Sequence, residues 1–284
     1  CKAYVNALST PFLERMLRTP DRLPANTKLN VQYRMHPSIR SFPSKQFYDS
    51  CLQDQVSTPF RPMLRCIWRQ EDEHIVFVDC RSPHSFGLVA EDGRRRSMAA
   101  TLFETNTSLK NSGEVELVVE AYDRLLKQGA RHPSEIAIIT PYRAQQQQIR
   151  DGLFERVGLA ARDTSVGTVH ALQGSERDYI ILSFVRSTTE DAAAHLASST
   201  DLTISIDEKS PALRQVCESN LGILSDSRLL NVSLTRAKYG LVCIGNRAVL
   251  ASGSNDFYDL SDDLASRGCM LSGAEFKALG RALF

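Results

Sequence analysis

The chain has 284 residues, of which 42% are hydrophobic and 24% charged, a composition that is ordinary for a globular protein and sufficient for a sizeable core. Its formal net charge of +1 at pH 7 excludes a uniformly basic surface, so a nucleic acid would have to bind in a local groove. The seven cysteines include no C-x-x-C pair, which argues against a zinc site or a disulfide framework and favours a reducing compartment, either the cytoplasm or the nucleus.

The first part of the chain is expected to contain short elements separated by polar segments. Thr10 and Pro11 are typical of a helix start, and a second helix is expected from Pro37, interrupted or kinked around Pro43. Short apolar runs predict strands at residues 28–32 and 75–79. The polar residues 81–111 are interpreted as a surface loop inserted into the fold.

The second part shows a clearer alternation of helices and strands. The helix over 114–128 has the most regular apolar stripe, with Ser112 as its N-cap and Gly129 at its end. Residues 188–219 lack periodicity and are taken as a second insertion. The remaining expected elements are strand 135–140, helix 143–154, strands 165–170 and 178–185, helix 228–237, strand 239–245 and one or two C-terminal helices.

This alternation predicts an α/β fold with a mostly parallel sheet and helices on both faces. In such sheets, ligands bind at the carboxyl ends of the strands. The polar segments expected at that edge are residues 140–142, residues 169–176 and the turn that precedes Leu229.

The segment VQYRMHPS (31–38) places Tyr33 and Arg34 between a strand and a helix. A turn at the end of a strand can present a ring and a guanidinium to one ligand. For an isolated Tyr-Arg pair, however, the favoured interpretation is that Tyr33 packs and Arg34 makes a surface ion pair.

In TVHALQGSERDYIILS (168–183), Gly174 permits a tight turn and Glu176 can accept a hydrogen bond from a ribose hydroxyl. A polar turn between two core strands explains the same residues about equally well. His170 alone is more often structural than catalytic.

In NVSLTRAKYG (231–240), helical spacing is expected to place Asn231, Thr235 and Lys238 near one face, with Arg236 to the side. An ordinary helix followed by an ordinary strand is the alternative. An arginine suits a γ-phosphate because its fork stays charged and binds phosphate oxygens in a bidentate way. Yet the sequence contains no phosphate loop of the form G-x-x-x-x-G-K-[ST].

Together these segments resemble motifs IV, V and VI of superfamily 1 helicases, and they are most similar to the up-frameshift-like RNA and DNA helicases, the group that includes the nonsense-mediated decay helicase. The segments that carry the resemblance follow the family order over nearly the whole chain: 32–52, 136–146, 168–187 and 229–246. The resemblance implies that residues 1–284 are the second RecA-like motor domain. The first domain, with the Walker loop and the acidic magnesium-binding segment, is expected before Cys1.

The resemblance also implies roles for individual residues. Arg34 and Arg236 correspond to the arginines that contact the γ-phosphate of ATP, whose Mg²⁺ the missing first domain mainly holds. The nucleotide-binding set also includes Gln32, Tyr33 beside the adenine, Gly174 in the shaping turn, and Glu176 near the ribose. The residues expected in the nucleic-acid groove are Thr140, Pro141, Tyr142, Thr168 and His170. An acidic residue stands at the position of His170 in the decay helicase, so this sequence departs from that helicase there.

The resulting expectation is an ATP-dependent helicase motor that moves 5′ to 3′ on single-stranded RNA or DNA, with a role in nonsense-mediated decay as one pathway. The partners are the preceding RecA-like domain and regulatory proteins. A membrane is not expected, because no apolar run approaches the roughly 20 residues that cross a bilayer. The isolated chain should be inactive as an ATPase. The alternative is a non-catalytic RecA-like scaffold, which an upstream domain without the Walker lysine would favour.

Overall fold

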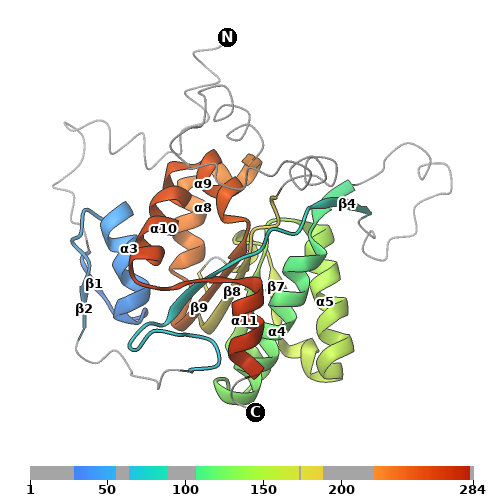
Figure 1. Cartoon of the computed structure of the whole chain (residues 1–284). Coiled ribbons are helices and arrows are strands. Elements are labelled where there is room, and N and C mark those ends of the chain that lie inside the picture. The colour runs from blue at the N-terminus through green and yellow to red at the C-terminus, as the bar shows by residue number, and fades with distance from the viewer. Residues whose placement is uncertain (1–28, 56–63, 89–106, 173, 188–220, 282–284) are drawn as a thin grey trace, which may run out of the picture. The chain divides into compact units, whose positions relative to one another are not determined.

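The computed structural model describes residues 29–55, 64–88, 107–172, 174–187 and 221–281 (Figure 1). Contacts within the chain divide it into two units, Cys1–Val31 and Gln32–Phe284. The site lies in the second unit. The expected helix near Thr10 and the insertion at 188–219 lie outside the described residues.

Among the described residues, six parallel strands form the central sheet of the second unit. Each neighbouring pair of strands is parallel, and the main register sets Ile180 of β8 beside Leu241 of β9. Parallel strands need crossover connections, which the intervening helices supply. The predicted α/β fold with a mostly parallel sheet is confirmed. The strand order is β10 (Met270–Ser272), β3 (Ile75–Asp79), β9 (Ala237–Gly245), β8 (Arg177–Ser183), β6 (Ile136–Ile139) and β7 (Ser165–Gly167).

Helices cover both faces of this sheet, as in a RecA-like domain (Figure 1). Successive strand residues point to opposite faces, so Val76 and Val78 of β3 pack in one core cluster and Ile75 and Phe77 in the other. The first cluster includes side chains of α4 (Ser112–Gln128), α5 (Arg143–Val157) and α11 (Gly273–Arg281). The second includes side chains of α3 (Pro37–Phe47), α8 (Ser227–Leu234), α9 (Arg247–Gly253) and α10 (Asn255–Ser266).

Shorter elements connect these layers. β4 (Ser85–Leu88) and β5 (Thr107–Lys110) pair antiparallel, so the described ends of the expected loop at 81–111 form a two-stranded ladder. These two segments become strands by pairing with each other, and no local pattern in the sequence encodes that pairing. The other short elements are β1 (Val31–Gln32), β2 (Gln53–Asp54), and the 3₁₀ turns η3 (Pro133–Glu135), η4 (Gly158–Asp163), η5 (His170–Leu172) and η7 (Gly222–Ser225).

Several helix predictions need correction. Pro43 does not interrupt α3, which continues to Phe47 with Pro43 buried inside it. The N-cap of α4 is Asn111, not Ser112, because the Asn111 side chain accepts a hydrogen bond from the Glu114 N–H. The predicted end at Gly129 is confirmed. After β9, the described residues form three helices and a strand rather than one or two helices.

Candidate nucleotide and nucleic-acid sites

The turn that carries Arg34 is fixed by the side chain of Gln32. The Gln32 amide oxygen accepts hydrogen bonds from the backbone N–H groups of Arg34, at 2.9 Å, and Met35, at 2.7 Å. Its amide nitrogen donates to Asp54 at 2.6 Å. The N–H of His36 donates to the Lys238 carbonyl at 2.8 Å, which ties this turn to β9. Gln32 therefore shapes the Arg34 turn from within.

The guanidinium of Arg34 joins two segments that are distant in the sequence. Its Nε donates to the Glu176 carboxylate at 2.6 Å, and its Nη1 donates to the Thr235 carbonyl at 3.0 Å. Lys238 approaches the other carboxylate oxygen of Glu176 at 3.0 Å. The hydrogen bond from Arg34 is the main cause that lowers the pKa of Glu176. Glu176 is thus an ionised carboxylate held between two cations.

Arg236 lies beside this group and is anchored by backbone carbonyls. Its Nε donates to Val232 at 3.0 Å, and its Nη1 donates to Ser175 at 3.1 Å. Burial lowers the pKa of Arg236, and the positive charge of Arg34 lowers it further. The charge of Arg34 therefore acts on Arg236, and both guanidiniums are held by the same two stretches of chain, residues 175–176 and 232–235. The Nη2 atoms of Arg34 and Arg236 make no hydrogen bond to the described residues.

The whole group has an excess of positive charge. Arg34, Arg236 and Lys238 are the cations, and Glu176 and Asp178 are the carboxylates, with Asp178 at 3.9 Å from Lys238. We call these five residues the arginine cluster. Gly174, in the same turn as Glu176, has a φ of +78°, a backbone conformation that glycine adopts without strain. Tyr33 is 66% exposed beside Arg34, with its ring available to a ligand.

The position of the arginine cluster in the sheet differs from the prediction. Glu176 immediately precedes β8 and Arg236 immediately precedes β9, so both lie at the amino ends of these strands. Residues 168–176 lead from the carboxyl end of β7 to the amino end of β8, and this crossing moves Glu176 to the opposite edge. The helical face predicted for Asn231, Thr235 and Lys238 is also wrong. Helix α8 ends at Leu234, where Thr235 caps it through Asn231 and Ser233.

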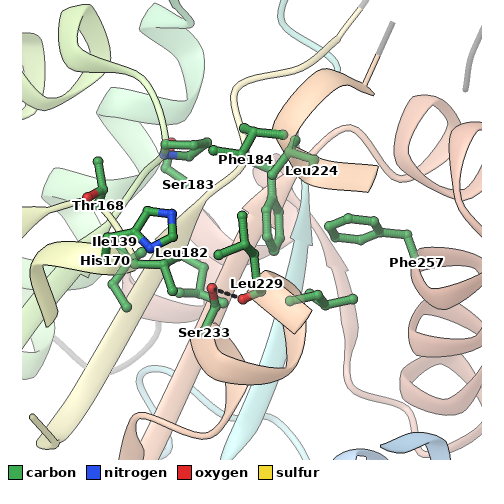
Figure 2. A pocket seen from close by; sticks show the side chains of 14 residues that line it. Ile139, Thr168, His170, Leu182, Ser183, Phe184, Leu224, Leu229, Ser233 and Phe257 are labelled. Carbon is green, nitrogen blue, oxygen red and sulfur yellow. Dashed lines mark hydrogen bonds between the residues drawn. The ribbon is translucent and has the colours of Figure 1, made fainter. Parts of the chain in front are cut away.

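The residues predicted for the nucleic-acid groove do lie at the carboxyl ends. Pro141, Thr168 and His170 line a cavity of about 60 Å³ that is mostly apolar. Figure 2 shows Thr168 and His170 on one side of this cavity and Phe257 on the other. Thr140 is different, because its side chain is fully buried, while its N–H donates to the Gly167 carbonyl at 3.0 Å.

Tyr142 contacts Arg186 at this edge of the sheet, and the sequence analysis had not assigned a role to Arg186. Its hydroxyl accepts a hydrogen bond from Nε of Arg186 at 2.7 Å. The Arg186 guanidinium carbon lies 5.6 Å from the centre of the Tyr142 ring. Arg186 follows β8 directly after the buried residues Phe184 and Val185. A lone arginine behind a buried strand was the only signal in the sequence.

The described residues were also compared with the requirements of a metal site and of a membrane span. Among the residues that the structure describes, no three His, Cys, Asp or Glu side chains gather as a metal site. Within the same ranges, no helix is both long enough and apolar enough to span a membrane. The positive arginine cluster suits the phosphates of a nucleotide rather than its metal ion.

Comparison with known proteins bears on the identity of the chain. The model of the AAA domain family matches residues 8–248. Regulator of nonsense transcripts 1 from Caenorhabditis elegans is 32% identical over 88% of this chain and 19% of its own length. ATP-dependent helicase upf1 from Schizosaccharomyces pombe is 31% identical over 88% of the chain and 22% of its own length. Probable helicase MAGATAMA 3 from Arabidopsis thaliana is 31% identical over 79% of the chain and 23% of its own length.

The chain spans about a fifth of the length of these relatives. The match includes the QYRMHP and NVSLTRAK segments, which supply Arg34 and Arg236 to the arginine cluster. Nucleotide binding is a property that this family implies. The chain therefore belongs to the AAA domain family, as a helicase domain of the up-frameshift-like group of superfamily 1.

Proposed function

We propose that this chain is the second motor domain of an ATP-dependent helicase and that it supplies Arg34 and Arg236 to ATP hydrolysis. The observation that carries the proposal is the paired anchoring of these arginines on adjacent turns. Glu176 and the Thr235 carbonyl hold Arg34, while the Val232 and Ser175 carbonyls hold Arg236. Two guanidiniums that raise each other's electrostatic energy are stabilised when a polyanion approaches both.

The chemistry follows from where charge develops. In phosphoryl transfer, negative charge spreads over the oxygens of the transferring group, and a preorganised arginine stabilises that charge. In our proposal, ATP and its Mg²⁺ are held mainly by another RecA-like domain of the parent protein. Arg34 and Arg236 are then two fixed cations that contact the γ-phosphate across the cleft between the two domains.

The remaining residues of the nucleotide site take supporting roles in this proposal. The exposed ring of Tyr33 stacks near the adenine, and the turn at Gly174 brings the backbone close to the nucleotide. Gln32 holds the Arg34 turn. Glu176 orients Arg34 and Lys238, and its approach to the ribose stays a prediction.

The opposite edge of the sheet is the proposed path of single-stranded RNA or DNA. Pro141, Tyr142, Thr168 and His170 offer a proline, two rings and a hydroxyl, which suit bases and phosphates. The contribution of Thr140 is to hold the end of β6 to the end of β7 through its backbone N–H, since its side chain is buried. From the family likeness, we also propose that the parent protein moves from 5′ to 3′, acts in transcript decay and binds regulatory proteins.

The test is an ATPase measurement on the full parent protein, with and without single-stranded RNA or DNA, beside the same measurement on the isolated chain. The proposal predicts nucleic-acid-stimulated hydrolysis by the parent and none by the isolated chain. A parent protein that binds a strand but hydrolyses no ATP would instead support the scaffold alternative.

A further inference from the structure

The turn that follows β8 has an unusual backbone. Val185 has a φ of +70°, in the left-handed region. A β-branched residue is unfavourable there, because its Cβ crowds the backbone. Such conformations persist where the surroundings determine them fully, and they are found mainly at functional sites. The residue placed by this turn is Arg186.

Two side chains from the start of α4 hold Val185 in this conformation. The Glu114 carboxyl accepts hydrogen bonds from the Val185 N–H at 2.9 Å and from the Ser183 hydroxyl at 2.7 Å. The Asn111 amide donates to the Val185 carbonyl at 3.3 Å. Glu114 and Asn111 are both completely buried. A polar support of this kind, built inside the core, fixes the direction in which Arg186 leaves the strand.

The guanidinium of Arg186 is then oriented by Tyr142. The tyrosine hydroxyl accepts from Nε at 2.7 Å, and the ring lies 5.6 Å from the guanidinium carbon. No carboxylate among the described residues pairs with Arg186. Its positive charge also helps to lower the pKa of His84, after burial as the larger cause. Nε is satisfied, and the two terminal nitrogens make no hydrogen bond to the described residues, so they form a fork that suits an oxyanion.

We propose that Arg186 is a contact for a backbone phosphate of the single strand, positioned by Tyr142 and the strained Val185 turn. This inference rests on the proposed function, which places the strand along Pro141, Thr168 and His170. Arg186 follows the carboxyl end of β8, at the same edge as those residues. The arginine cluster lies at the amino ends of β8 and β9, so the phosphate at Arg186 belongs to the strand and not to ATP.

The test is equilibrium binding of fluorescent oligo-U and oligo-dT by the full parent protein over a series of salt concentrations. Arg186→Gln should weaken binding roughly tenfold at about 0.1 M salt and reduce the salt dependence by roughly one phosphate contact. Tyr142→Phe keeps the ring and the arginine charge, so it should weaken binding only a few-fold and leave the salt dependence unchanged. Arg131→Gln, which removes an exposed arginine before β6, is the charge-matched control and should change neither quantity.

The outcomes separate this inference from the proposed function. A parent protein that binds neither single-stranded RNA nor single-stranded DNA would contradict the proposed function itself. If the wild type binds and Arg186→Gln, still folded by its thermal melting curve, retains the full affinity and salt dependence, only the assignment of Arg186 is overturned. Loss of affinity with an unchanged salt dependence would also overturn it, because the contact would then not be to a phosphate.

Discussion

Arg34 donates to the Glu176 carboxylate at 2.6 Å, although 142 positions separate the two residues in the sequence. Lys238 approaches the second oxygen of the same carboxylate at 3.0 Å. Glu176 therefore connects the turn before α3 with the start of β9. This ion pair brings the QYRMHP segment into the arginine cluster.

Glu176→Gln should lower kcat of the parent ATPase by roughly 10-fold or more, because Arg34 loses a charged acceptor that orients it. The measurement is kcat and KM with ATP and with 3′-deoxyATP. If Glu176 acts only through the ribose, KM for ATP rises, kcat is unchanged, and the variant no longer distinguishes the two nucleotides. Gln146→Asn, which alters a buried amide outside the arginine cluster, serves as a control for general disturbance.

Gly240→Ala should destabilise the fold by about 2 kcal/mol or more, because overpacking a close core forces neighbours to move. A Cβ at Gly240 would overlap the ring of Trp68 and lie 2.8 Å from the Tyr179 ring. Gly167→Ala is the matched control, since its Cβ would meet only the Ala171 Cβ, at 3.4 Å. Urea denaturation of both variants checks this, and equal stabilities would contradict it.

The stacked pair of His36 and His74 should make stability depend on pH. Their rings lie 3.8 Å apart, and burial with the nearby His74 lowers the pKa of His36 to about 4. Asp54 and Asp72 act in the opposite direction. The unfolded chain binds this proton at higher pH than the folded chain, so the stability that is present above about 6.5 is lost as the pH falls toward 4.

The measurement is the free energy of unfolding from pH 4.5 to 7 for the wild type and His36→Asn. Asparagine can still cap α3 but does not titrate. The wild type should lose on the order of 1 kcal/mol more than the variant over this window, allowing for the partial exposure of His36. Parallel curves would show that His36 does not contribute.

Glu114 should give a pH dependence of opposite sign. Complete burial raises the pKa of its carboxyl to about 8, so the folded chain holds a proton that the unfolded chain releases near 4.5. Stability from this group is present below about 4.5 and lost as the pH rises through about 8. Glu114→Gln keeps an acceptor for Val185 and should be more stable above pH 8 by about 1–3 kcal/mol. Unfolding curves at pH 6 and 9 test this, and a variant less stable at pH 9 would contradict it.

The central strands could be predicted from local pattern, whereas β10 and the β4–β5 pair could not. The apolar runs at Ile75–Asp79 and Ile136–Ile139 are buried between two helical layers, so their composition alone marks them as strands. By contrast, β10 has only three residues, and its pairing with β3 makes it a strand. The described ends of residues 81–111 become β4 and β5 for the same reason.

The candidate site was predictable in its residue types but not in its layout. The motif resemblance named Arg34, Glu176 and Arg236, and the structure brings these three together. Periodicity cannot show that residues 168–176 cross to the other edge of the sheet. Nor could it assign Arg186, whose direction depends on the buried side chains of α4.

Strand β8 connects the arginine cluster with the sheet edge at which we propose that RNA or DNA binds. Glu176 precedes β8, and Arg186 lies three residues beyond its last residue, Ser183.

The most direct test of the account is single-turnover ATP hydrolysis by the full parent protein with saturating RNA, comparing wild type with Arg236→Ala and Arg34→Ala. Because an arginine at the γ-phosphate can be worth roughly 10³-fold or more in rate, each variant should lose most of its hydrolysis while still binding ATP. Arg131→Ala should hydrolyse ATP as the wild type does. Wild-type rates in either Arg236→Ala or Arg34→Ala would contradict the role assigned to the arginine cluster.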